Sequence, residues 1–181
     1  MRKLLLHSCC GPCSTHVIET LSSEYRITVF YYNPNILPEE EYIHRRSEQE
    51  RFIREYSELN DLKIDYIECD YVPETFFSVI KGHETDKEGG GRCDLCIAHR
   101  MEVTANRAKE LGFDLFCTTL SVSPHKNAAF INKTGEFLSK KTGVPYLVSD
   151  FKKKDGYKHS VEMSKRFGLY RQNYCGCNLG K

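Results

Sequence analysis

Short apolar runs alternate along this chain with longer segments in which apolar residues recur every three or four positions. The short runs are rich in β-branched and aromatic residues, which is typical of buried strands. They lie at Leu4–Leu6, Ile27–Tyr31, Ile64–Ile67, Leu115–Leu120 and Tyr146–Val148. The pattern predicts five short strands.

The longer segments predict helices. One amphipathic helix is expected to begin at about Thr15, and others cover Glu39–Leu59, Asp94–Leu111 and the region from about His125 to Lys141. Three acids open Glu39–Leu59, where they suit the positive end of a helix dipole. Because strands and helices alternate, the sequence predicts a Rossmann-like α/β fold, with a mostly parallel sheet flanked by helices on both faces.

Composition narrows the picture further. At 181 residues and 40% hydrophobic, the chain can bury one core, so a single domain over residues 1–181 is expected. The net charge of +1 leaves room for a local basic patch. No apolar run is long enough for a membrane span, and the leucines after Lys3 are too few for a secretory signal. We therefore expect a cytoplasmic protein. Separately, the sequence at Lys81–Arg92 predicts a loop.

Seven of the nine cysteines fall into three motifs. Cys9–Cys13 follows the first strand and precedes a helix, where free N–H groups and the helix dipole favour thiolates. Cys93 and Cys96 stand at the start of a predicted helix, and Cys175 and Cys177 flank a glycine. In a reducing compartment such cysteines indicate metal ligation or redox chemistry. We expect a cysteine-rich metal site at the carboxyl edge of the sheet, where open α/β folds bind ligands.

The number of thiols exceeds the needs of one metal centre. A structural zinc ion takes four ligands and a [4Fe–4S] cluster also takes four. The surplus is consistent with a second metal ion, a substrate-facing thiolate or an unused cysteine. The two remaining cysteines, Cys69 and Cys117, stand singly near predicted strands and are expected to be buried free thiols.

Two other functions compete with a metalloenzyme. Cys10-Gly-Pro-Cys13 matches the dithiol of thioredoxins and would act as a dithiol oxidoreductase. Against this alternative, the chain has no Trp, and five clustered cysteines would remain unused. The third hypothesis is a zinc-stabilised RNA-binding module.

Six motifs occur in a characteristic order: His7–Cys13, Tyr32–Ile36, Arg92–Cys96, Thr118–Pro124, Asp150–Lys153 and Tyr170–Cys177. In these motifs the chain resembles the cobalamin-independent epoxyqueuosine reductases of the QueH family. The resemblance implies an iron–sulfur enzyme that reduces epoxyqueuosine to queuosine at the wobble position of tRNA. It also implies an external electron donor.

The reaction suggests roles for particular residues. Removing an epoxide oxygen as water takes two electrons and two protons, whereas a [4Fe–4S] cluster usually passes one electron at a time. An additional iron ion could polarise the C–O bond. Adjacent side chains on an extended backbone point to opposite sides, so Cys9 is predicted to serve catalysis while Cys10 faces the cluster. Asp150 is a candidate acid or ligand, or else caps a turn, and His7 orients a ligand or is a core histidine.

Base recognition would fall to residues beside the cysteines. Asn33 and Asn35 follow a strand and suit the polar edge of a base, although Asn-Pro-Asn is also ordinary turn chemistry. Arg171 and Tyr174 adjoin the last cysteines and suit stacking or phosphate contact in an anticodon loop.

Phosphate contacts need basic side chains on the surface. Lys152 and Lys153 belong to a run of three lysines, and the pairs Lys140–Lys141 and Arg45–Arg46 are further candidates. Isolated charge runs of this kind are more usually a solvated face.

Overall fold

One four-stranded sheet organises the computed structural model, which describes residues 1–179. Its strands are β1 (Arg2–Ser8), β2 (Tyr25–Tyr31), β3 (Asp65–Glu68) and β4 (Leu115–Thr118). They lie in the order β3-β2-β1-β4, and every neighbouring pair is parallel. Within the described range, no helix combines the length and apolar character needed to cross a membrane.

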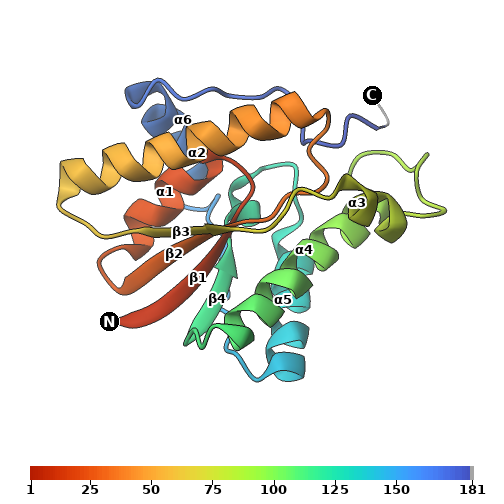
Figure 1. The fold of residues 1–181 in the computed structure, drawn as a ribbon, viewed down its shortest axis with the longest axis horizontal. Coiled ribbons are helices and arrows are strands. Elements are labelled where there is room, and N and C mark those ends of the chain that lie inside the picture. Colours follow the sequence, from red (N-terminus) through yellow and green to blue (C-terminus); the bar gives the residue numbers. More distant parts are fainter. Residues whose placement is uncertain (180–181) are drawn as a thin grey trace.

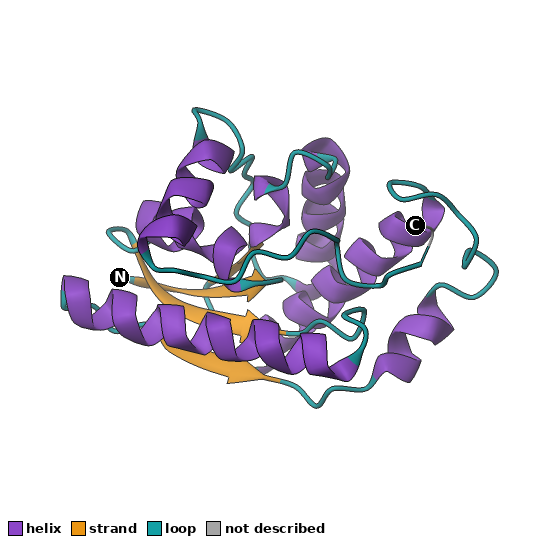
Figure 2. Cartoon of the chain, turned by 90° about the horizontal axis from the view of Figure 1, so that it is seen from above, coloured by secondary structure: helices purple, strands orange, loops and turns teal. Residues whose placement is uncertain are grey.

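Helices cover both faces of this sheet (Figures 1 and 2). One layer holds α1 (Gly11–Leu21), α2 (Glu39–Asn60) and α6 (Gly156–Arg166), and the other holds α4 (Gly91–Glu110) and α5 (Ala128–Thr142). Side-chain alternation along β1 explains the two layers, because Leu4 and Leu6 pack against the first layer and Leu5 against the second. The predicted α/β fold is confirmed, and the sheet is entirely parallel.

Two helices begin earlier than predicted, and both differences concern cysteines. Helix α1 begins at Gly11 rather than Thr15, because Pro12 fits the first turn, where its missing N–H costs no hydrogen bond. Helix α4 begins at Gly91 rather than Asp94. Cys13 and Cys93 therefore lie within the first turns of helices, not ahead of them, and Cys96 lies one turn further along α4.

Helix α5 begins later than predicted, at Ala128 rather than His125. The side chain of Asn127 accepts a hydrogen bond from the backbone N–H of Phe130 and so caps the helix. The loop predicted at Lys81–Arg92 contains no regular element before Gly91.

The predicted strand at Tyr146–Val148 is wrong. Only an isolated bridge joins Tyr146 to Phe116, because Pro145 lacks an N–H and the chain turns away after two hydrogen bonds with Phe116. The strand predicted to reach Leu120 ends at Thr118, and a 3-10 turn, η1 (Thr119–Val122), follows. Two helices, α3 (Pro73–Val79) and α6, were not predicted.

Candidate metal centre and active site

Cys9, Cys10 and Cys13 form one group of thiols at the carboxyl end of β1. Their three sulfur atoms lie within 4.8 Å of one another, and the Sγ atoms of Cys9 and Cys10 are 3.8 Å apart. The expectation that these neighbours point to opposite sides is therefore wrong. The strand ends at Ser8 and the backbone bends at Cys9, so strand alternation no longer applies. We call these three residues the cysteine trio.

Within the trio, the surroundings favour the thiolate form of Cys9. Hydrogen bonds from Cys10 and Cys13 lower the pKa of Cys9 well below its usual value, and the nearby cations Lys126 and Arg100 add to this effect. The same shared hydrogen bonds raise the pKa of Cys13. The trio is thus a set of soft ligands with one thiolate already favoured, which suits binding of iron or zinc.

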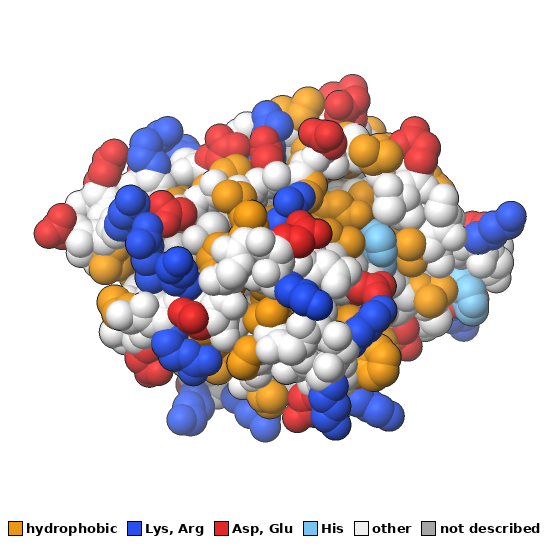
Figure 3. All heavy atoms as spheres, turned by 60° about the horizontal axis from the view of Figure 1, so that its bottom comes forward, with side chains coloured by type: hydrophobic (Ala, Val, Ile, Leu, Met, Phe, Trp, Pro, Cys, Tyr) orange, Lys and Arg blue, Asp and Glu red, His pale blue; other side chains and the backbone are white. Residues whose placement is uncertain are grey.

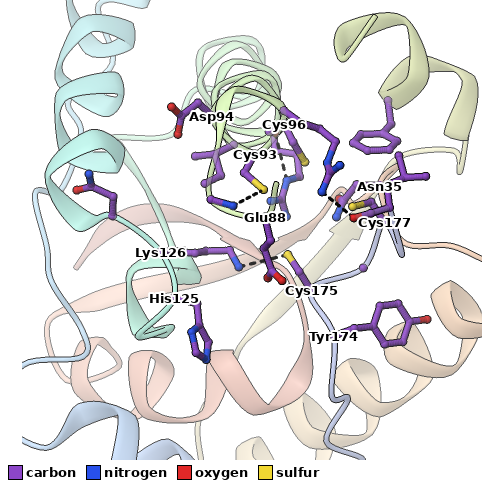
Figure 4. Close-up of a pocket in the computed structure, with 18 of the residues that line it drawn as sticks. Asn35, Glu88, Cys93, Asp94, Cys96, His125, Lys126, Tyr174, Cys175 and Cys177 are labelled. Carbon is purple, nitrogen blue, oxygen red and sulfur yellow. Dashed lines mark hydrogen bonds between the residues drawn. The ribbon is translucent and has the colours of Figure 1, made fainter. Parts of the chain in front are cut away.

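Cys93, Cys96, Cys175 and Cys177 line a second cavity, shown in Figure 4. The first two project from the start of α4, and the other two come from the segment after α6. A hydrogen bond from the backbone helps to position one of these sulfurs, because the N–H of Gly89 donates to Cys93 Sγ at 3.2 Å. We call these four residues the cysteine quartet.

Two cations lie against the quartet without a carboxylate partner. The Nζ of Lys126 is 3.4 Å from Cys175 Sγ, and Arg100 is only 2% exposed and bonds the carbonyl of Cys96 and the amide oxygen of Asn33. Among residues 1–179, neither cation forms an ion pair with a carboxylate. Enclosed charge without a counterion is costly. An anionic metal–thiolate centre fits both the donor set and these cations.

A neighbouring pocket joins the two cysteine groups. Its walls include Cys9, Cys13 and Cys175, and it shares Lys126 and Arg100 with the quartet cavity. The three cysteine motifs, predicted to form one cysteine-rich site, therefore form two groups that lie side by side and share Lys126 and Arg100 in their walls.

The structure brings Arg171 and Tyr174 to this pocket and gives the two asparagines different places. Arg171 and Tyr174 line it. Asn33 is buried and bridges the carbonyl of Ser8 and the guanidinium of Arg100, so its side chain braces the site. Asn35 lines the quartet cavity, and its buried Oδ1 has no hydrogen-bond partner among the described residues.

Asp150, Lys152 and Lys153 are not part of either cysteine-lined pocket. The carboxylate of Asp150 pairs with Lys152 at 2.9 Å and with Lys153 at 3.9 Å, and it lines a separate pocket beside His16. Lys152 also donates to backbone carbonyls at Ser121 and Lys126. Lys153 is exposed.

The structure also gives the surroundings of His7 and of the two single cysteines. His7 is fully buried, with its ring nitrogens bonded to Thr118 Oγ1 at 2.9 Å and to the carbonyl of Tyr32 at 3.1 Å. Burial, followed by the charge of Arg100, lowers its pKa to about 4, so it is a neutral core histidine at pH 7. Cys117 is a buried free thiol as predicted, whereas Cys69 is half-buried.

Sequence reasoning missed the cations that surround the thiols. Arg100 stands one helical turn after Cys96, a spacing that places both on one face of a helix. Lys126 carries no such signal. Arg45, predicted as a phosphate contact, is buried and holds the last cysteine motif, donating to the carbonyls of Cys175 at 2.9 Å and Tyr174 at 3.3 Å.

The fold and site define a class: a parallel α/β protein with two adjoining thiol groups at the carboxyl edge of its sheet. A family model described as "Epoxyqueuosine reductase QueH" matches residues 4–181. A protein of that name from Streptococcus pyogenes is 43% identical over 96% of this chain and 68% of its own length. One from Thermotoga maritima is 36% identical over 98% of this chain and 89% of its own length.

This chain belongs to the epoxyqueuosine reductase QueH family, a family of oxidoreductases. A relative from Staphylococcus epidermidis, 42% identical over 97% of this chain and 74% of its own length, carries the same name. The resemblance found in the six motifs is confirmed.

Proposed function

We propose that this protein reduces epoxyqueuosine to queuosine at the wobble position of tRNA, with a [4Fe–4S] cluster and an additional iron ion as cofactors. The observation that carries the proposal is the pairing of a cysteine quartet and a cysteine trio on either side of two cations without carboxylate partners. The names of the relatives support epoxyqueuosine as the substrate.

The thiol count matches two metal centres. Cys93, Cys96, Cys175 and Cys177 would hold the cluster, and the cysteine trio would hold the additional iron. Such cofactors supply single electrons and Lewis-acid polarisation of an epoxide C–O bond. The overall reaction consumes two electrons from an external donor and two protons, and it releases the epoxide oxygen as water while an alkene forms.

The surrounding side chains would stabilise charge and exclude water. Lys126 is placed to donate a hydrogen bond to an oxygen that gains negative charge in the shared pocket. Arg100 is fixed by Asn33 and contributes a permanent positive field. Gln172 donates to Cys10 Sγ at 3.1 Å, which holds that sulfur in place. Cys9, the sulfur with the lowered pKa, is the proposed catalytic thiolate.

The same pocket suits an unstacked base. Tyr174, Tyr157 and Arg171 line it, and aromatic rings and guanidinium planes stack on bases extruded from single-stranded RNA. Asn35 lines the adjoining quartet cavity, where its buried Oδ1 is an acceptor without a partner among the described residues. Asp150 has no part in this proposal, because its carboxylate is engaged by two lysines outside the cysteine-lined pockets.

Phosphate contacts are proposed for the exposed lysines that follow Asp150. The side chain of Lys153 is 77% exposed, and its Nζ lies 3.9 Å from the Asp150 carboxylate, so the ammonium remains accessible to an anticodon-arm phosphate. Figure 3 shows a face of the molecule on which basic side chains are interspersed with acidic ones. Because the net charge of the chain is small, we propose that contacts with RNA phosphates are confined to local groups of basic side chains and are not spread over the surface.

Anaerobic purification with iron and sulfide counting tests the proposal, together with turnover of tRNA that carries epoxyqueuosine. The wild-type protein should contain sulfide, and Cys177→Ala should lose the visible absorption of the cluster and turnover. Cys117→Ala, which removes a buried thiol outside both groups, is the control and should keep both.

Two outcomes would contradict the proposal. One zinc ion without sulfide would favour the zinc-stabilised RNA-binding module. A metal-free protein with a stable Cys10–Cys13 disulfide would favour the dithiol oxidoreductase.

A further inference from the structure

A second group of possible metal ligands lies away from the cysteines, between α1 and α6. His16, Glu19 and His159 each offer one ligand atom, and these three atoms lie within 4.8 Å of one another. His16 and Glu19 are three residues apart on α1, so they share one face of the helix. His159 reaches this face from α6, where its Nε2 contacts the carboxylate of Glu19.

A polar side chain lies behind each of the two imidazole rings. The Thr20 hydroxyl donates to the carbonyl of His16 at 2.7 Å, so its oxygen is left to accept from the Nδ1–H of His16 at 3.5 Å. This arrangement leaves the lone pair of His16 on Nε2. On the other helix, Glu162 faces Nδ1 of His159 at 3.8 Å. A carboxylate or hydroxyl behind each ring is the usual outer support of metal-binding histidines.

The packing of the two helices brings the His16 ring against the start of α6. Gly156 opens α6, and a Cβ placed there would lie 2.7 Å from His16 Nε2 and would also clash with the carbonyl of Phe151. Glycine therefore lets the ring approach the start of α6. The rings of His16 and His159 meet edge to face, with centroids 5.4 Å apart.

We propose that His16, Glu19 and His159 bind a zinc ion that fixes α6 against α1. Two imidazoles and one carboxylate form a donor set that zinc prefers, with water as the fourth ligand. Zinc bonds of about 2.0–2.2 Å place tetrahedral ligand atoms about 3.3 Å apart. The side chains of Glu19 and His159 are about two-fifths exposed, at 41% and 40%, so they can rotate to close this distance. The proton between His159 and Glu19 leaves to solvent as zinc binds.

The site is separate from the cysteines but linked to the active-site pocket. Cys13 lies one turn before His16 on α1, and Tyr157 and Ser160 of α6 line the pocket beside Cys9. Zinc between the helices would therefore hold one wall of the substrate pocket in place.

Cobalt substitution tests the site without interference from thiols. The probe is one equivalent of Co²⁺, added anaerobically to protein whose cysteines already hold iron. A nitrogen–oxygen site gives weak d–d bands, whereas thiolate-bound cobalt gives intense charge-transfer bands. In the difference spectrum against the same protein before Co²⁺ is added, we expect d–d bands alone. Zn²⁺ should abolish these bands by displacing Co²⁺, and it should raise the Tm of the wild-type protein.

Three variants and one control assign the bands. His159→Ala and His16→Ala should weaken Co²⁺ binding at least tenfold, and Glu162→Gln should weaken it about tenfold by removing outer support. His44→Ala removes an exposed histidine elsewhere and should bind like the wild type. Iron and sulfide contents should be equal in all four variants, which separates this test from the cysteine sites. Thiolate bands alone, or unchanged binding in His159→Ala, would overturn the proposal.

Discussion

Replacing Lys126 by methionine removes one of the two cations beside the cysteine quartet while keeping a similar side-chain volume. Its Nζ lies 3.4 Å from Cys175 Sγ. With an effective dielectric constant near 20, Coulomb's law gives about 5 kcal/mol for opposite unit charges at that separation. Hydrogen bonds to charged groups contribute a net of about 1.5–3 kcal/mol once desolvation is included. Iron retention by the quartet should therefore weaken about 10- to 100-fold, since about 1.4 kcal/mol corresponds to a factor of ten.

The assay is the rate and extent of iron loss to a chelator under anaerobic conditions, followed through the visible absorption. Lys141→Met is a matched control, because Lys141 lies at the end of α5 and pairs with Glu102 on the surface. Burial alone would lower the pKa of Lys126, yet the sulfurs of Cys175 and Cys9 raise it, so the ammonium stays charged over the working pH range. Wild-type iron retention in Lys126→Met would refute the electrostatic role.

Three further predictions address other parts of the molecule. Cys9→Ser should keep the cluster absorption and sulfide but lose turnover and about one equivalent of iron, and loss of the whole cluster would contradict separate centres. Replacing Lys152, Lys153 and Lys154 together by glutamine should reduce the salt dependence of binding to a tRNA anticodon arm, whereas an unchanged slope would place the contacts elsewhere. His7 has a folded pKa of about 4, below its unfolded value of about 6.5, so the unfolded chain binds the extra proton and stability falls as the pH falls between these values. Urea unfolding should show a loss of about 2 kcal/mol from this group between pH 7.5 and pH 5, and His7→Asn should lack that component.

The fold could be predicted where burial controls the pattern. The run Leu4–Leu6 is buried on both faces of the sheet, and a short continuous apolar run of this kind is typical of a central strand. Helix α6 was missed because its sequence, Gly156–Arg166, is mostly polar and buries only a few residues, Met163 among them. Tyr146–Val148 resembled a strand, yet its position beside Pro145 allows only a bridge. In both cases the position of the segment in the fold, and not the intrinsic preference of its residues for helix or strand, determines the structure.

The candidate site could be predicted from cysteine spacing but not from charge. Cysteine is rare enough that three cysteine motifs in one chain indicate that they meet at one site in the fold. Arg100 and Lys126 are common residue types that usually lie in solvent, so nothing marks them until the fold encloses them. The relation between Cys9 and Cys10 was misjudged because the bend after β1 is a property of the backbone that spacing does not reveal.

The segment that carries Cys175 and Cys177 contains no helix or strand, and two guanidinium groups hold it by its carbonyl oxygens. Arg45 bonds Tyr174 and Cys175, and Arg92 donates to the carbonyl of Leu179 at 2.7 Å. In a saturation mutagenesis screen scored by metal content, Arg45 and Arg92 should therefore rank with the cysteines themselves. Lysine should not replace either of them, because one ammonium group lacks the forked geometry that spans two acceptors.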